Sequence, residues 1–364
     1  MSEPPPAKVL VVTRPTRARP LTRRRASIAM GDDARDAELP SDDEYEHVSY
    51  LGQGSFGRVA LVRRKSDGEP LVVKTLLMHH ETMTREDLFN AENEVEVLRL
   101  VAGHLNVTNL VDARRAPDGR HFRIVQEYCD EGTLDDRIAA WRGGSVSAAW
   151  DEHDVLHIFS QLCLAVRHLH ALNVLHRDIK PANVMLARLP RGAAPAEAVV
   201  LVVKLGDFGL SRVLAPGAEA HAHVGTPHYV SPEIVEGRGY DHRSDVWALG
   251  CCLHEALVGR RPFESQTRMS RDELRLAIAR GEHERVPVER AGGRLRRLVD
   301  RCLSYAPEDR PSLEEILETR CVRAAGKKFR ELALRAGVDP GEDPWAGADA
   351  AGRRGSDAEE RDSF

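Results

Sequence analysis

The chain has 364 residues, with 52 basic against 57 acidic side chains and a formal charge of −5. This near balance argues against a nucleic-acid binder that depends on a global positive field. No apolar run reaches the roughly 18 residues that span a bilayer, so we expect no membrane segment. Only seven of the basic residues are lysines. Each lysine is therefore a candidate for a site that requires a compact ammonium group.

The two ends of the chain are expected to be largely disordered tails. Residues 1–30 carry seven basic groups and one acid, whereas residues 31–46 carry eight acids and one arginine. A solvated tail is the favoured interpretation of 1–46, with a transit peptide or a nuclear-import patch as alternatives for its basic part. Residues 323–364 are expected to form a C-terminal extension whose last part is rich in Gly, Ala, Asp and Glu. Regulatory partners that bind these tails are left open.

Residues 47–127 predict a small β-rich lobe. Runs of β-branched and apolar residues at 47–51, 58–63, 71–76 and 121–125 are separated by Gly, Asp and Pro, which is typical of antiparallel strands. One helix is predicted between them, because residues 84–87 resemble a capping box and apolar residues follow at helical spacing up to residue 102.

Residues 128–322 predict a larger, mostly helical lobe. An apolar stripe at helical spacing runs from residue 155 to 169, and residues 246–253 are apolar almost all round, as in a central buried helix. The expected fold class is therefore α+β, with a cleft where the two lobes meet.

The first chemical signal is a glycine-rich turn between two predicted strands. Gly52, Gly54 and Gly57 would let backbone N–H groups approach a polyphosphate, although a hairpin without a ligand is the alternative. Lys74 lies on the next strand, and twenty residues later Glu94 falls on the apolar stripe of the predicted helix. A carboxylate on an inward face needs a partner, so we predict a Lys74–Glu94 ion pair that holds the ammonium against nucleotide phosphates.

Two further clusters carry the groups that phosphoryl transfer requires. Asp178, Lys180 and Asn183 lie within six positions, and Asp207 follows in a turn after a β-run. Asp178 could accept the proton of an attacking hydroxyl, and Lys180 could steady the γ-phosphate. Asn183 and Asp207 offer the hard oxygen ligands that Mg²⁺ prefers.

With these motifs in this order, residues 47–322 resemble a eukaryotic protein kinase domain, with a bilobal fold, ATP and Mg²⁺ as cofactors and Asp178, Lys180, Lys74 and Glu94 as catalytic residues. The resemblance implies that ATP contacts nine residues, which are Leu51, Gly52, Gly54, Gly57, Val59, Lys74, Gln126, Glu127 and Cys129. It also implies that Asp245 anchors the catalytic loop and that Glu233 pairs with Arg310.

The choice of hydroxyl follows from three positions of this resemblance. Lys180 and Thr226 match the serine/threonine pattern, and Leu210 resembles kinases that favour serine. Thr133 and Ala182 stand where kinases that require arginine in their substrates often carry acids, so no strong demand for arginine is expected.

Residues 124–129, 161–166, 176–183 and 224–233 are similar to the NIMA-related (NEK) kinases, with calcium/calmodulin-like and other serine/threonine groups as rivals. That similarity implies a cytoplasmic protein, with cytoskeletal, centrosomal or ciliary roles, and leaves the nucleus open. A pseudokinase that binds ATP as a scaffold is the alternative function. It would be expected to lose Lys74, Asp178, Asn183 or Asp207, and all four are present. Neither a nucleic acid nor a membrane is an expected partner.

The chain departs from the family pattern in its activation segment. Residues 212–225 contain no hydroxyl, and Ala222 stands where NIMA-related kinases carry a threonine. Arg177 therefore lacks a phosphorylated partner. We predict that activity does not depend on phosphorylation of this segment, with Glu219 as a weaker charge contact.

Three further polar side chains are those of Gln126, Lys65 and Lys204. Gln126 replaces the apolar residue usual at the back of the adenine pocket, so its carboxamide must find partners. Lys65 and Lys204 are interpreted as ordinary charges at strand edges.

Overall fold

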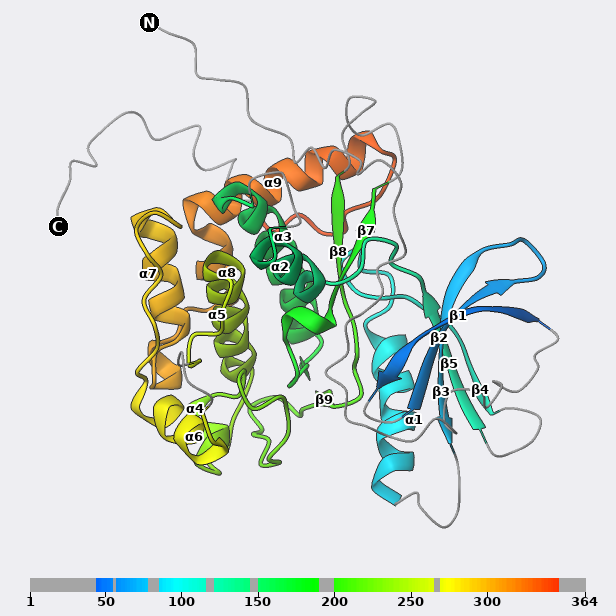
Figure 1. Cartoon of the computed structure of the whole chain (residues 1–364), viewed down its shortest axis with the longest axis horizontal. Coiled ribbons are helices and arrows are strands. Elements are labelled where there is room, and N and C mark those ends of the chain that lie inside the picture. Colours follow the sequence, from blue (N-terminus) through cyan, green and yellow to red (C-terminus); the bar gives the residue numbers. More distant parts are fainter. Residues whose placement is uncertain are drawn as a thin grey trace, which may run out of the picture.

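The structure is a computed structural model that describes residues 44–54, 57–77, 85–115, 121–144, 150–189, 200–264 and 269–346. A sheet with one helix forms a small lobe, and a larger group of helices forms the other (Figure 1). The predicted α+β, bilobal fold class is thereby confirmed. Among the described residues, no helix has both the length and the apolar character needed to cross a membrane. Residues 1–43 of the predicted N-terminal tail lie outside the described residues.

The small lobe is a five-stranded antiparallel sheet in the order β1-β2-β3-β5-β4. Its elements are β1 (Tyr45–Gly54), β2 (Gly57–Arg64), β3 (Pro70–Leu77), α1 (Arg85–Leu100), β4 (Leu110–Arg115) and β5 (His121–Glu127). Four of these strands and the helix match the predicted ranges. The edge strand β4 was not predicted, because all of its residues are half-exposed or exposed and give no apolar alternation.

The register of the sheet positions the side chains that matter for the site. Val59 of β2 is opposite Lys74 of β3, which is in turn opposite Ile124 of β5. Residues that are paired across strands project from the same face. Gln126 lies two residues after Ile124 and therefore shares this face, which α1 covers with Glu94.

Gly57 has a structural requirement of its own. A Cβ at this position would lie 2.1 Å from the carbonyl oxygen of Thr75 on β3. A side chain is therefore excluded by the neighbouring strand, whether or not a phosphate approaches.

The large lobe consists mainly of helices around α5, as predicted. The elements are α2 (Leu134–Arg142), α3 (Glu152–Ala171), α4 (Pro232–Val235), α5 (Arg243–Val258), α6 (Arg271–Arg280), α7 (Gly293–Cys302), α8 (Leu313–Glu318) and α9 (Arg320–Arg335). Residues 244–257 of α5 are all buried, which explains why this helix is apolar almost all round. Asp151 begins α3 with a capping box that involves Asp154.

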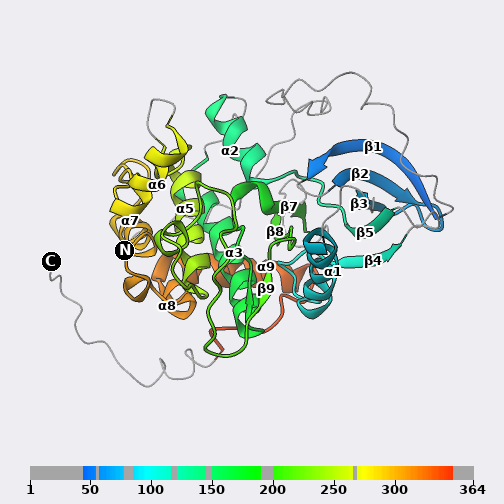
Figure 2. The same ribbon diagram turned by 90° about the horizontal axis from the view of Figure 1, so that it is seen from below.

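Four short strands arrange the polar clusters between the lobes. β6 (Val174–Leu175) pairs with β9 (Arg212–Val213), and β7 (Val184–Arg188) pairs with β8 (Leu201–Leu205). Residues 176–183 connect β6 to β7, and residues 206–211 connect β8 to β9. The two predicted clusters are therefore brought to the same end of paired strands, beside α1 (Figure 2).

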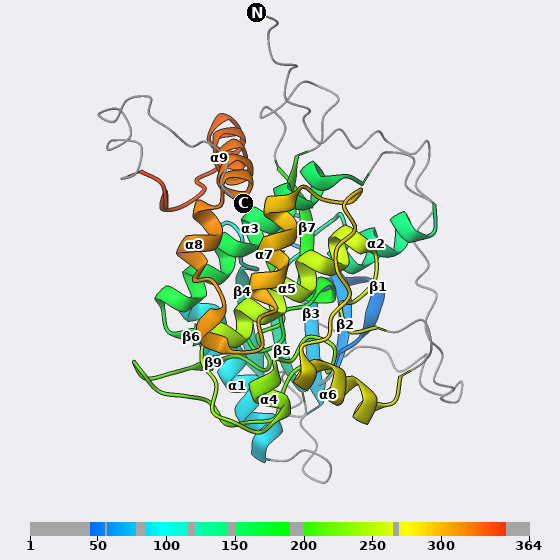
Figure 3. The same ribbon diagram turned by 90° about the vertical axis from the view of Figure 1, so that its left-hand side faces the viewer.

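The C-terminal extension differs from the expected disorder over 323–346. Residues 323–335 belong to α9, which packs along α3 (Figure 3). The chain then turns back, and Arg330 donates hydrogen bonds to the carbonyl oxygens of residues 340–342. Trp345 is fully buried, and its indole ring lies so close to Gly326 that a Cβ there would be 2.3 Å from it. Composition alone suggested a disordered tail, because one tryptophan hardly changes the average hydrophobicity of the segment.

Candidate active site

The predicted pair of Lys74 and Glu94 is present and buried. Lys74 Nζ donates to Glu94 Oε1 at 2.8 Å and to Oε2 at 2.7 Å, and it lies 3.4 Å from Asp207 Oδ1. Burial alone would lower the pKa of Lys74, but the carboxylates of Glu94 and Asp207 outweigh it and leave the pKa above its ordinary value. A charged ammonium is thus fixed between α1 and the segment that follows β8.

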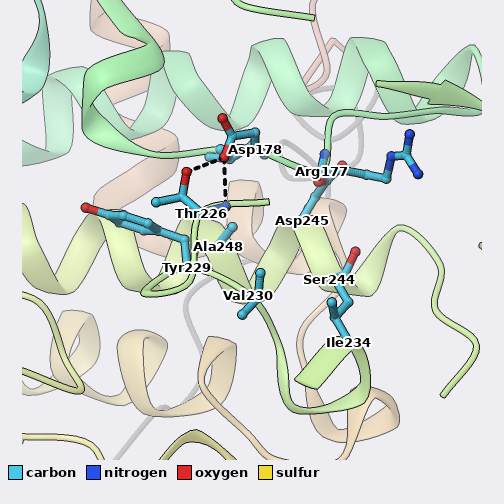
Figure 4. A pocket seen from close by; sticks show the side chains of 10 residues that line it. Arg177, Asp178, Thr226, Tyr229, Val230, Ile234, Ser244, Asp245 and Ala248 are labelled. Atoms are coloured by element: carbon cyan, nitrogen blue, oxygen red, sulfur yellow. Dashed lines mark hydrogen bonds between the residues drawn. The ribbon is translucent and has the colours of Figure 1, made fainter. Parts of the chain in front are cut away.

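Three side chains from the predicted site contact one carboxylate, that of Asp178. Its Oδ1 accepts hydrogen bonds from Thr226 N (3.0 Å) and Thr226 Oγ1 (2.6 Å), which Figure 4 shows. Lys180 Nζ donates to Asp178 Oδ2 at 2.6 Å and to Thr226 Oγ1 at 2.8 Å. Asn183 Nδ2 donates to Asp178 Oδ2 at 3.1 Å. Hydrogen bonds therefore join Asp178 to residues that lie up to 48 positions away in the sequence.

A buried aspartate holds the backbone of this cluster. Asp245, at the start of α5, accepts from His176 N and Arg177 N, each at 3.0 Å, and its Oδ2 lies 2.9 Å from His170 Nε2. Burial opposes ionisation of Asp245, but its contacts with His170 and His176 keep the pKa of its carboxyl below the usual value. The carboxylate therefore stays charged and fixes the loop, as the resemblance implied.

Asn183 and Asp207 form a suitable pair of ligands for a divalent cation. Asn183 uses its amide nitrogen in bonds to Asp178 O and Oδ2, and these bonds do not involve its amide oxygen, which could bind a cation. Burial would raise the pKa of Asp207, but the charges of Lys74, His176 and Lys180 hold the pKa of its carboxyl below the usual value. The donor set thus fits Mg²⁺, which prefers carboxylate and carbonyl oxygens.

Asp207 and Arg177 share an uncommon backbone conformation. Their φ angles are 63° and 66°, in the left-handed region that residues other than glycine rarely adopt. Such conformations persist where surrounding contacts enforce them, and they cluster at active sites.

The residues expected to contact adenine lie where β5 ends. Gln126 is half-buried, and its Nε2 donates to Thr108 Oγ1 at 3.3 Å, so its carboxamide has found a partner. Glu127 Oε1 accepts from Asn109 N at 2.7 Å. Burial raises the pKa of Cys129 to about 12, so this thiol stays protonated at neutral pH. Leu51, Gly52 and Val59 are half-buried in the first two strands.

Lys204 was wrongly interpreted as a charge at a strand edge. It is 6% exposed, and its Nζ lies 2.9 Å from Glu127 Oε1. The side chain points from β8 to the end of β5 because this carboxylate is the partner that a buried ammonium needs. The scarcity of lysines in the sequence was the signal that could have singled it out.

The expected partner of Arg177 was also wrong. Its Nε donates to Leu210 O at 2.5 Å, and its Nη1 lies 3.4 Å from Tyr240 Oη. Glu219 instead lies beside Gly239, where its carboxylate would meet any added Cβ. Tyr240 is thus a residue of the site that the sequence analysis missed.

The predicted pair of Glu233 and Arg310 is present in the large lobe. Arg310 Nη1 and Nη2 donate to the two carboxylate oxygens at 2.6 and 2.7 Å, and both side chains are buried. The guanidinium also lies over the Trp247 ring, 5.0 Å from its centroid. This bidentate pair ties α4, next to Thr226, to the segment that precedes α8.

The fold and this arrangement of charges define a class of protein. The protein kinase domain model matches residues 45–322, and the chain therefore belongs to the protein kinase domain family. The serine/threonine-protein kinase Nek2 of Homo sapiens is 37% identical over 301 residues, which cover 80% of this chain and 63% of that protein. Nek8 of Danio rerio, also a serine/threonine-protein kinase, is 35% identical over 282 residues, which cover 77% of this chain and 37% of that protein.

These similarities confirm the predicted resemblance to NIMA-related serine/threonine kinases. The chain spans less than two thirds of the length of either relative.

Proposed function

We propose that this chain is a serine/threonine protein kinase that transfers the γ-phosphate of ATP to Ser and Thr hydroxyls of proteins. The observation that carries the proposal is the short hydrogen bond of 2.6 Å between Thr226 Oγ1 and Asp178 Oδ1, with Lys180 Nζ 2.8 Å from the same hydroxyl. An aliphatic hydroxyl held between a carboxylate and an ammonium is the arrangement that an acceptor hydroxyl would need during transfer.

Asp178 would take the proton of the acceptor hydroxyl. The bond from the hydroxyl oxygen to the γ-phosphorus forms, the bond from that phosphorus to the β,γ-bridging oxygen breaks, and ADP leaves. Lys180 would stabilise the negative charge on the transferring group, because its ammonium lies beside the carboxylate that receives the proton.

The nucleotide would be held by residues of both lobes. Lys74, fixed by Glu94, would contact its phosphates, and Asn183 and Asp207 would bind Mg²⁺. Bound Mg²⁺ would neutralise charge on the phosphate oxygens. Adenine would lie against Gln126, Glu127 and Cys129. The remaining contacts to the nucleotide would come from the first strands, at Leu51, Gly52, Gly54, Gly57 and Val59.

The acceptor would bind along the segment that contains Thr226. The Glu233–Arg310 pair would stabilise this segment, because it ties α4 to the large lobe. Leu210 favours serine over threonine as the acceptor, and the neutral side chains of Thr133 and Ala182 argue against a demand for arginine. The proposed location is the cytoplasm, including cytoskeletal structures, where NIMA-related kinases act. Partners that bind the terminal segments remain part of this proposal.

A positional peptide library with purified protein and Mg²⁺–ATP tests these points. We expect phosphorylation of Ser above Thr, none of Tyr, and no strong selection for arginine before the acceptor. Selective phosphorylation of Tyr would contradict the assignment of the acceptor. No phosphorylation of any peptide by protein that still binds ATP would favour the pseudokinase alternative.

A further inference from the structure

Arg177 and the segment before Thr226 meet at one tyrosine hydroxyl. The Oη of Tyr240 lies 3.4 Å from Arg177 Nη1 and donates to the carbonyl oxygen of Ala222 at 2.9 Å. Ala222 stands where the family resemblance places a threonine in NIMA-related kinases. The hydroxyl thus links the arginine before Asp178 to the backbone of the position that lacks a phosphate.

The backbone on both sides of this contact is also paired. Ala220 and Tyr240 form an antiparallel bridge, with Ala220 N to Tyr240 O at 2.8 Å and Tyr240 N to Ala220 O at 3.0 Å. The Tyr240 ring is 3% exposed and packs with Ala220, Leu175 and Ile234 in an apolar cluster. A tyrosine in this setting fixes the segment without any charge.

Residues 220–225 lead directly to Thr226, which contacts the carboxylate of Asp178. Gly225 has a φ of 108°, and a Cβ there would lie 2.8 Å from the carbonyl oxygen of Arg177. Its neighbour Thr226 donates to Asp178 through both its backbone nitrogen and its hydroxyl. A shift of residues 220–225 would therefore be transmitted to Asp178 over a few bonds.

The hydroxyls of Ser211 and Thr226, which flank this segment in the sequence, are already engaged. Ser211 is 1% exposed, and its Oγ donates to His176 O at 3.3 Å. The Thr226 hydroxyl lies between Asp178 and Lys180. A phosphate on either residue would break these contacts, so neither replaces the missing threonine.

We propose that Tyr240 is a positioning residue that holds the activation segment in its working conformation in place of a phosphorylated threonine. Its hydroxyl and its backbone bridge to Ala220 secure one end of residues 220–226, and Asp178 secures the other. This inference rests on the proposed function, since it assigns the regulation of that same site. With Tyr240 in this role, the kinase is active as synthesised and needs no preceding phosphorylation of the activation segment.

The variant Tyr240→Phe tests the proposal, because it removes only the hydroxyl and keeps the ring in its cluster. We expect kcat/KM for a serine peptide to fall about 3- to 10-fold, with KM for ATP unchanged. Amide hydrogen exchange should become faster in 220–225 and stay the same in α5. The matched control is Tyr305→Phe, because the Tyr305 hydroxyl donates to Glu236 on an exposed surface and should leave all these values unchanged.

Phosphatase treatment of the wild-type protein should leave its activity unchanged. The combined variant of Tyr240→Phe with Arg177→Met should lose less than the product of the two single losses, because both changes break one contact. Wild-type kinetics and unchanged exchange in Tyr240→Phe would overturn the proposal, as would inactivation of the wild-type protein by phosphatase through a phosphate on Ser211 or Thr226.

Failure of the proposed function would look different. If the wild-type protein transferred no more phosphate than Asp178→Asn, the kinase assignment would fail. Hydrogen exchange in Tyr240→Phe would still decide whether the hydroxyl holds the segment.

Discussion

Lys204 and Glu127 form an ion pair that joins β8 of the large lobe to the end of β5 in the small lobe. Lys204 Nζ on β8 lies 2.9 Å from Glu127 Oε1 at the end of β5, and the same oxygen accepts from Asn109 N at 2.7 Å. The lysine is almost completely buried, whereas the carboxylate is about a quarter exposed. The pair fixes the end of β5, where Gln126 and Glu127 are proposed to contact adenine. Lys204 itself lies three residues before Asp207.

Replacing this lysine should weaken ATP binding more than catalysis. We expect Lys204→Met to raise KM for ATP about 3- to 10-fold, because it leaves the carboxylate of Glu127 without its cation. The value of kcat should stay within about twofold, since Lys204 touches no reacting atom. The control is Lys328→Met, which breaks a half-exposed pair with Glu331 on α9. Equal KM values for the two variants would contradict this role for Lys204.

The buried lysine of the active site should not tolerate arginine. A guanidinium is larger than an ammonium and cannot keep both oxygens of Glu94 and the oxygen of Asp207 at the distances of Lys74 Nζ. We expect Lys74→Arg to lower kcat by about 100-fold or more, in line with the loss of a preorganised charge. Steady-state kinetics with a serine peptide measures this, and activity near that of the wild type would argue against the pairing as described.

The C-terminal extension should contribute to the stability of the large lobe. Trp345 is fully buried against Gly326, and its Nε1 donates to Leu317 O at 3.3 Å. We expect Trp345→Ala to lower the free energy of unfolding by about 3–5 kcal/mol, because it leaves a large cavity. Urea denaturation measures the change. Leu334→Ala, at an exposed position of α9, should change the stability by less than about 0.5 kcal/mol; equal effects would refute the buried position of Trp345.

Stability should fall in mild acid because three histidines are held neutral. Burial lowers the pKa values of His104, His157 and His254 to about 4 in the folded protein. Between that value and the ordinary pKa of about 6.5, the unfolded chain binds more protons than the folded one, so stability decreases as the pH falls. Each histidine contributes up to about 1.4 kcal/mol per pH unit in this range.

Buried carboxyl groups act in the opposite direction, since burial raises the pKa values of Asp154, Glu94 and Glu255. Burial raises the pKa of Asp154 to about 6, so below that pH the folded protein binds this proton before the unfolded chain does. This uptake cancels the destabilising effect of about one histidine. Urea denaturation from pH 7 to 4.5 measures the net slope. His157→Gln should reduce the slope by about one proton, and a stability that is constant over this range would contradict the buried, neutral histidines.

Several parts of the site could be predicted from sequence, because their residues occur in short segments with diagnostic spacing. The contacts of Asp178 with Lys180 and Asn183 are local, and the Lys74–Glu94 pair follows from a buried carboxylate on a helix that needs a cation. The α+β fold followed from strand and helix periodicities that the tertiary structure did not override.

Other parts could not be predicted, because single residues find partners far along the chain. Tyr240 contacts Arg177, which lies 63 residues earlier in the sequence, and no sequence pattern around the tyrosine predicts this contact. Trp345 lies in a segment whose average composition is typical of disorder, and Lys204 faces Glu127 only because two lobes meet there. The edge strand β4 lacks the apolar alternation on which strand prediction depends.

Asp178 is the residue on which the proposed phosphotransferase activity depends most directly. The most direct measurement is transfer of labelled γ-phosphate from Mg²⁺–ATP to a serine peptide by the wild type, Asp178→Asn and a control, Asp272→Asn, on the exposed start of α6. We expect equal activity of the wild type and the control, and a loss of at least about 100-fold in Asp178→Asn. Equal transfer by Asp178→Asn and the wild type would contradict this role of Asp178.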